Sequence, residues 1–204
     1  MKTILSTLLV LALAVTAFAG TNPNIHAYLT VNATGEAVNY ICPTPYTQFS
    51  AYVCLDNLGV GGGVRGMALK LDRTFGAFVT GSANLLGGLT IGAPEVDWSI
   101  VAGENCAMPN GAGIVLAGRV DYLYTGTPGT LILNGHPQLL NKTLDCDNLA
   151  DWFCVHITDP QMPHPTISGN LGVCVPAPEP VVYACEQQSA VEDATWGTIK
   201  AMYK

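Results

Sequence analysis

The sequence predicts an all-β protein, an antiparallel β-sandwich followed by a short C-terminal helix. Apolar residues occupy every second position in residues 49–56 and again in residues 67–72, the pattern of strands with one buried face. Similar runs recur at intervals of about 8–14 residues, separated by Gly, Pro and Asn. No long segment before residue 176 has the 3.6-residue period of a helix, so we expect strands to build the core.

Residues 1–19 have the features of a cleaved signal peptide. Lys2 supplies a positive charge, the run Ile4–Phe18 is apolar and uncharged, and Ala17-Phe18-Ala19 is a small-residue cleavage site. The apolar run is shorter than the roughly 20 residues that a membrane-spanning helix needs. We therefore expect a protein that is secreted, periplasmic or on the cell surface, with no stable membrane span after cleavage.

The expected β-sandwich domain covers residues 20–175. Its two alternating runs are joined by a glycine-rich connection, residues 59–63, which predicts that they pair as antiparallel strands of one sheet. The turn Gly126–Gly129 predicts a hairpin between strands 114–124 and 130–133. One face of strand 114–124 is expected to carry Ile114, Leu116, Val120 and Tyr122. The other expected strands are 25–31, 38–42, 75–79, 96–102, 152–158 and 167–175, whereas 84–91 has no clear period.

The chain changes character after the sandwich. Residues 176–188 begin with three closely spaced prolines and are expected to form an extended linker. Residues 189–204 are expected to form a helical tail. Ser189 and Glu192 have the spacing of a capping box, and Trp196, Ile199 and Tyr203 share one helical face.

The charge balance argues against partners that present phosphate groups. The whole chain has a net charge of −7, and removal of Lys2 with the signal peptide leaves seven basic residues against fifteen acidic ones, a formal charge of −8. Such a surface repels phosphate groups, so we expect neither nucleic acid nor anionic lipid as a partner.

All seven cysteines lie in the exported part, where disulfide bonds are their usual fate. We expect Cys42–Cys54 and Cys174–Cys185 bridges, because each closes a short loop, and a third bridge from Cys106 to either Cys146 or Cys154. One cysteine must then remain unpaired, and buried free thiols are the alternative for all of them. The paired C-x-x-C spacing of zinc sites does not occur.

The familiar catalytic motifs are missing or lie in the wrong context. Residues 61–66 match G-x-G-x-x-G, but a strand rather than a helix follows, which favours a hairpin loop over a dinucleotide site. No G-x-S-x-G or H-E-x-x-H sequence occurs, and the four histidines are scattered. We therefore assign no catalytic residue, expect no cofactor and predict that the protein is not an enzyme.

Two groups of acidic residues are candidate sites. Asp145, Asp147 and Asp151 are candidate calcium ligands, although the EF-hand pattern is missing and Asp147 could simply cap a helical turn. Glu95 and Asp97 would share one face of a strand beside Trp98, as a sugar-cleaving site would need. The plainer interpretation of this pair is a polar strand edge.

Four aromatic residues are candidate binding residues. Tyr52, Trp98, Tyr124 and Trp152 could stack on sugars or anchor a protein partner if they face outward. The alternations place Tyr52, Tyr124 and Trp152 on a different face from the core residues. The alternative is that a loop or the C-terminal helix covers them.

The run Tyr52–Leu58, the glycines and then Val64–Asp72 resemble the opening strands of cohesin-like and related immunoglobulin-like sandwich domains of exported bacterial proteins. The resemblance implies a non-catalytic binding or scaffolding module on or outside the cell. The many cysteines depart from that family. The last residues, Thr195–Lys204, resemble a short tail at the ends of exported bacterial proteins, which implies a docking or sorting element; a helix packed on its own domain is the alternative.

Together these features predict an exported, non-catalytic module for protein binding, adhesion or envelope scaffolding. The alternative is a carbohydrate-binding or carbohydrate-cleaving module. In either case the expected partner, a protein or a glycan, lies outside the cytoplasm.

Overall fold

A computed structural model of the chain describes residues 26–58, 63–135, 142–145, 152–154, 156–157 and 169–178, with the backbone alone given for the three segments between 142 and 157. The predicted signal peptide, the helical tail and most of the linker lie outside these residues. Among the described residues no helix has the length and apolar character needed to cross a membrane.

The described part of the chain is all-β and contains no helix, which confirms the predicted fold class at this level. The strands are β1 (His26–Thr30), β2 (Tyr40–Ile41), β3 (Gln48–Asp56), β4 (Val64–Arg73), β5 (Ala77–Asn84), β6 (Gly87–Ile91), β7 (Trp98–Ala102), β8 (Val115–Tyr124), β9 (Gly129–Gly135), β10 (Lys142–Asp145), β11 (Trp152–Cys154), β12 (His156–Ile157) and β13 (Leu171–Val173).

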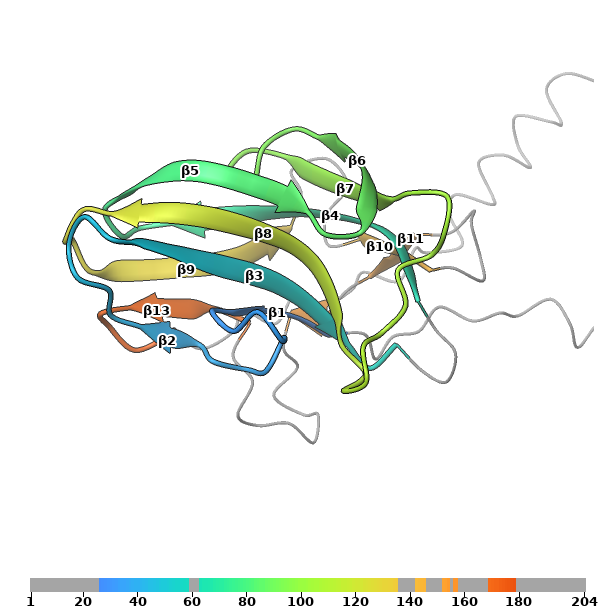
Figure 1. Cartoon of the computed structure of the whole chain (residues 1–204), viewed down its shortest axis with the longest axis horizontal. Helices are drawn as coiled ribbons and strands as arrows, with labels where there is room; N and C mark the ends of the chain where they lie inside the picture. Colours follow the sequence, from blue (N-terminus) through green and yellow to red (C-terminus); the bar gives the residue numbers. More distant parts are fainter. Residues whose placement is uncertain are drawn as a thin grey trace, which may run out of the picture.

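The strands form two sheets in which most neighbours are antiparallel. One sheet has the order β12-β1-β3-β8-β5. The other has the order β11-β10-β4-β9-β13-β2, and β7 adds to it by pairing with both β4 and β6. Two pairs, β1–β12 and β2–β13, are parallel. Figure 1 shows β3, β8 and β5 side by side in one layer, with β4 and β9 in the layer behind.

The apolar core lies between the two sheets, and the alternation of residues correctly predicted the buried faces of the central strands. On β3, Phe49, Ala51, Val53 and Leu55 are buried in the common core, whereas Ser50 and Tyr52 are only partly buried. On β4 the buried set includes Met67, Leu69 and Leu71, as expected. Each strand therefore has the predicted inward face.

The predicted pairing of these two strands is wrong. β3 belongs to one sheet and β4 to the other, so the two strands do not form a hairpin. The physical reason is that both strands carry an apolar face, and each face is covered by the other when the strands lie on opposite sides of the core. Alternation establishes that a face is buried but not which strand covers it.

The predicted hairpin between strands 114–124 and 130–133 is also wrong, because β9 pairs with β4 and β13 rather than with β8.

The expected inward face of β8 is half correct. Val120 and Tyr122 are buried, but Val115 and Ala117 replace Ile114 and Leu116 as the inward residues. Ala117 is an extra residue opposite the Val53–Cys54 step of β3, and this bulge reverses which alternate residues face inward.

The disulfide pattern differs from the prediction. Cys42, next to β2, is bonded to Cys174, next to β13, so the expected Cys42–Cys54 and Cys174–Cys185 bridges do not form. Both cysteines directly follow strands that pair in parallel, which brings their Cα atoms to 4.3 Å. Cys106 is also disulfide-bonded. The side chains of its two expected partners, Cys146 and Cys154, and that of Cys185 lie outside the described residues. Cys54 is a buried free thiol.

Candidate binding surface

The structure buries two of the four candidate aromatic residues. Trp98 and Tyr124 belong to the core, so neither ring can meet an outside partner, and the outward position expected for Tyr124 is wrong. Tyr124 has the same parity along β8 as the buried Tyr122, which explains its position. Tyr52 is partly exposed on the outer face of its sheet, directly opposite Arg119. The side chain of Trp152 lies outside the described residues.

The predicted pair of acids beside Trp98 does not share a strand face. Glu95 and Asp97 lie in the turn before β7, because the strand begins only at Trp98. Both carboxylate oxygens of Glu95 accept hydrogen bonds from the Arg73 guanidinium, at 2.5 and 3.1 Å. Arg73 also donates to the backbone carbonyls of Phe75, just before β5, and Ala77, its first residue. The geometry therefore makes Glu95 the partner of a structural ion pair.

No group of three or more His, Cys, Asp or Glu side chains in the described part of the chain is arranged to hold a metal ion. The calcium candidates are not tested by this observation. The side chain of Asp145, and the whole of Asp147 and Asp151, lie outside the described residues.

A polar hollow lies on the outer face of the β3–β8–β5 sheet. It has a volume of about 330 Å³ and is lined by Gln48, Phe49, Ser50, Thr80 and Asp121. The Ser50 hydroxyl donates to Asp121 Oδ1 at 2.6 Å, and Arg119 Nε lies 3.1 Å from the same oxygen. The charge of Asp121 is therefore balanced within the protein, which leaves a nearly neutral surface rich in hydrogen-bonding groups.

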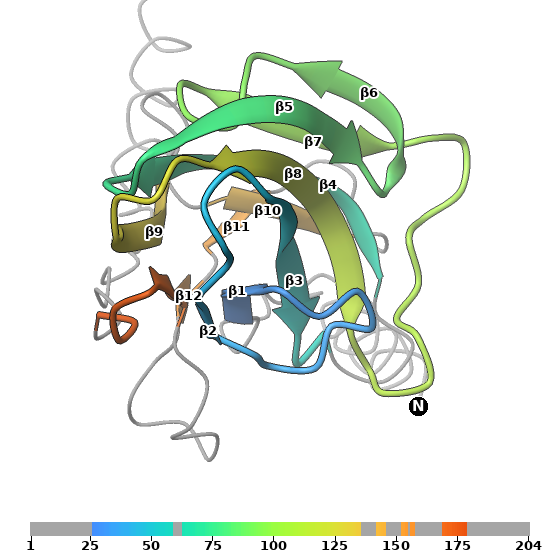
Figure 2. The ribbon, with the colours of Figure 1, turned by 60° about the vertical axis from the view of Figure 1, so that its left-hand side comes forward.

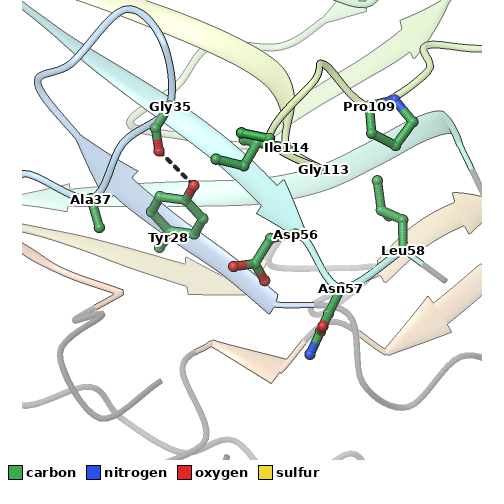
Figure 3. A pocket seen from close by; sticks show the side chains of 10 residues that line it. Tyr28, Gly35, Ala37, Asp56, Asn57, Leu58, Pro109, Gly113 and Ile114 are labelled. Carbon is green, nitrogen blue, oxygen red and sulfur yellow. Dashed lines mark hydrogen bonds between the residues drawn. The ribbon is translucent and has the colours of Figure 1, made fainter. Parts of the chain in front are cut away.

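A second pocket, of about 410 Å³, lies between two loops at the end of β3 (Figure 3). Tyr28 and Asp56 come from the strands, whereas Gly35, Pro109 and Ile114 come from the loops that follow β1 and β7. Asp56 is the only acidic or basic residue in the lining. The Tyr28 hydroxyl donates to the Gly35 carbonyl at 2.6 Å, so the polar end of this ring is already occupied.

The titratable groups beside this pocket do not form a nucleophilic site. Cys54 lies opposite Tyr28 in the β1–β3 pair, and burial raises the pKa of its thiol to about 12. A thiol acts as a nucleophile only when it is deprotonated, so Cys54 is inert near neutral pH. His26 Nδ1 lies 3.1 Å from Asp56 Oδ1, which makes a mostly buried pair at the end of the same strands.

We predict that Cys54 resists modification. Native protein at pH 8 should leave this thiol unlabelled by iodoacetamide, whereas protein unfolded without reductant should label it rapidly, because unfolding removes the burial that raises its pKa. Mass spectrometry of the peptide that contains Cys54 reads the result. Equal labelling of native and unfolded protein would contradict the buried position.

The same shift gives a pH dependence of stability. Below pH 9, the ordinary pKa value, the thiol is protonated in both states and its contribution to stability is fully present. Between pH 9 and about 12 the unfolded chain loses the proton while the folded chain keeps it, so the free energy of unfolding should fall as pH rises. Replacing Cys54 with alanine should reduce this slope.

The segment that holds β5 and β6 exposes several large apolar side chains. Residues 74–94, called here the uncharged segment, contain no Asp, Glu, Lys or Arg. Phe78 is 66% exposed, Leu89 63% and Ile91 57%, and every residue of β6 is exposed. Val79 and Leu85 within the segment, and Val96 just after it, are exposed as well. Soluble proteins seldom leave so many large apolar side chains in water on neighbouring elements.

The uncharged segment is held in place by its own hydrogen bonds. The Asn84 amide group donates to the carbonyls of Leu89 and Val101, at 2.9 and 2.8 Å. Its oxygen accepts from the Leu86 backbone N–H at 2.8 Å. One side chain thus fastens the β5–β6 turn to β7, and the exposed apolar residues are presented on a fixed framework.

Comparisons with protein-family models, with curated proteins and with solved structures give no match. The function therefore has to be inferred from the surface itself.

Motif reasoning missed the uncharged segment because nothing in it resembles a motif. Its lack of charge was a weak signal in the sequence, because residues 37–55 and 122–141 are uncharged over nearly the same length. The poor periodicity of residues 84–91 concealed it. A strand is recognised by apolar residues that alternate with polar ones on its outward face. In β6 apolar residues are exposed as well, so the strand shows no clear alternation.

Proposed function

We propose that this protein is an exported, non-catalytic β-sandwich module, of the cohesin-like or immunoglobulin-like kind, that binds a protein partner through the uncharged segment. Adhesion or envelope scaffolding outside the cytoplasm is the role that fits such a module. The observation that carries the proposal is the set of exposed apolar side chains on β5 and β6.

Two physical arguments support a protein partner. Full burial of a Leu or Ile side chain stabilises a complex by about 1.5–3 kcal/mol, so Leu89 and Ile91 alone offer a substantial gain. An uncharged apolar surface also suits another protein better than a sugar, because most of a sugar's surface consists of hydroxyl groups that need hydrogen-bond partners.

A non-catalytic role is supported by the state of the reactive groups. Cys54 is held as a neutral thiol, and the Glu95 carboxylate is engaged by Arg73. The alternative function, carbohydrate binding, is favoured by the polar hollow, where Ser50 donates to Asp121 on an open sheet face and Arg119 pairs with the same carboxylate. Asp121 would then accept sugar hydroxyls, with Tyr52 as a neighbouring ring.

The proposal predicts that charges in the uncharged segment abolish partner binding. Leu89→Lys/Ile91→Lys should reduce the yield of a cross-linked partner in intact cells at least about tenfold, because two buried apolar contacts become desolvated charges. Quantitative mass spectrometry after affinity purification measures the yield against wild type.

The chain offers a matched control. Tyr40 and Met108 lie outside the segment and are 50% and 57% exposed, so Tyr40→Lys/Met108→Lys adds the same charge to comparable side chains elsewhere. This control variant should give the same yield of cross-linked partner as wild type. Equal yields from all three proteins would overturn the proposal, and binding to a glycan array that depends on Asp121 would support the alternative.

A further inference from the structure

The uncharged segment lies where both sheets end. Within the described residues, β5 pairs only with β8, and β6 pairs only with β7. Each therefore has one edge without a strand neighbour. Figures 1 and 2 show β5, β6 and β7 together along one side of the molecule. Two edge strands that carry exposed apolar side chains thus lie on the same side of the molecule.

These edges lack the charges that usually keep edge strands apart. Natural sheets protect their edges with lysine, proline, short strands or bulges. β5 and β6 contain neither a charged residue nor proline, and each has one irregularity in its pairing. The irregularities discourage a regular backbone ladder, but they leave Phe78, Leu89 and Ile91 in water. Contact between side chains is therefore the expected driving force.

The charge distribution indicates which partner fits. In a two-fold symmetric contact each residue meets the same surface on the second copy, so a charged patch would face its own sign. With a formal charge of −8 on the mature chain (seven basic against fifteen acidic residues), two copies repel one another over most approaches. Residues 74–94 themselves carry no charge, so they add nothing to this repulsion. A different partner could gain affinity by placing basic groups against the acidic residues of this protein. The uncharged segment has no acidic residue for such groups to pair with.

We propose that two copies of this chain associate through their uncharged segments, with the β6 strands next to the two-fold axis. The inference rests on the proposed function and names its partner. Leu89 is the middle residue of β6, so it lies closest to its own counterpart in the second copy. Ile91, two residues further along the same strand, enlarges the apolar contact beside it.

Sedimentation velocity of the mature protein over a range of micromolar concentrations tests this inference. Wild type and Tyr40→Lys/Met108→Lys should sediment at twice the monomer mass as concentration rises, whereas Leu89→Lys/Ile91→Lys should stay monomeric. Far-ultraviolet circular dichroism establishes that all three are folded. A second test uses Leu89→Cys, which should form a covalent dimer under mild oxidation, while Met108→Cys should not.

The outcomes separate the two proposals. A wild type that is monomeric at every concentration, together with no dimer from Leu89→Cys, overturns self-association. If a partner is still lost from Leu89→Lys/Ile91→Lys in cells, the proposed function survives and the partner is another protein. If neither measurement depends on the segment, both proposals fail.

Discussion

Replacing Trp98 with alanine is expected to lower the free energy of unfolding by about 3–5 kcal/mol, the largest effect that we expect from any single substitution. Trp98 is fully buried on β7 and lies against Gly118 of β8, in the opposite sheet. Its indole ring therefore fills the space between the layers. Removing the ring leaves a cavity that a close-packed core cannot fully collapse.

Urea denaturation measures the loss, and Tyr46→Ala serves as the control because Tyr46 is highly exposed. The control should change stability by no more than about 0.5 kcal/mol. A loss below about 1 kcal/mol for Trp98→Ala would show that the ring does not fill the core.

Gly118 allows a sharper test of the same contact. A Cβ atom at this position would lie 2.4 Å from Trp98 Cη2, so Gly118→Ala should itself destabilise the protein by overpacking. In Trp98→Ala the space is free. The double variant should therefore lose less than the sum of the two single losses.

The second large effect concerns the Cys42–Cys174 disulfide. Replacing both cysteines with serine is expected to cost about 2–5 kcal/mol, because the bridge closes a loop of exceptional length and restricts the unfolded chain. The two cysteines are separated by 132 residues. Both must be replaced together, since a single change would leave a free thiol able to form wrong bridges.

Denaturation of the double variant and of the parent protein, both without reductant, gives the difference. Replacing Cys54 alone tests a cysteine that forms no bridge, and its effect should come from packing only. If Cys42→Ser/Cys174→Ser were as stable as the parent, the bridge would not constrain the unfolded state.

The sequence could predict which faces are buried because burial is a local property of a strand. Phe49 and Ala51 alternate with polar residues, and this alone identifies their inward side. It could not predict that β3 and β4 lie in different sheets, since strand pairing depends on residues far apart in the chain. The bulge at Ala117 likewise depends on the opposing strand and leaves no local sign.

The candidate surface was harder to predict for a related reason. Motif searches look for residues that are present, whereas the uncharged segment is marked by residues that are missing. Trp98 attracted attention as an aromatic residue beside two acids, but an isolated tryptophan is equally suited to a core. The Cys42–Cys174 bridge could not be inferred from spacing, because proximity came from the parallel β2–β13 pair.

The bond between Cys42 and Cys174 encloses strands β3–β13 within one covalent ring. A protease that cuts a single peptide bond anywhere inside that ring produces no separate fragments, because both sides of the cut stay joined through sulfur. A molecule nicked in this way can therefore keep its two layers together and continue to present the same surface.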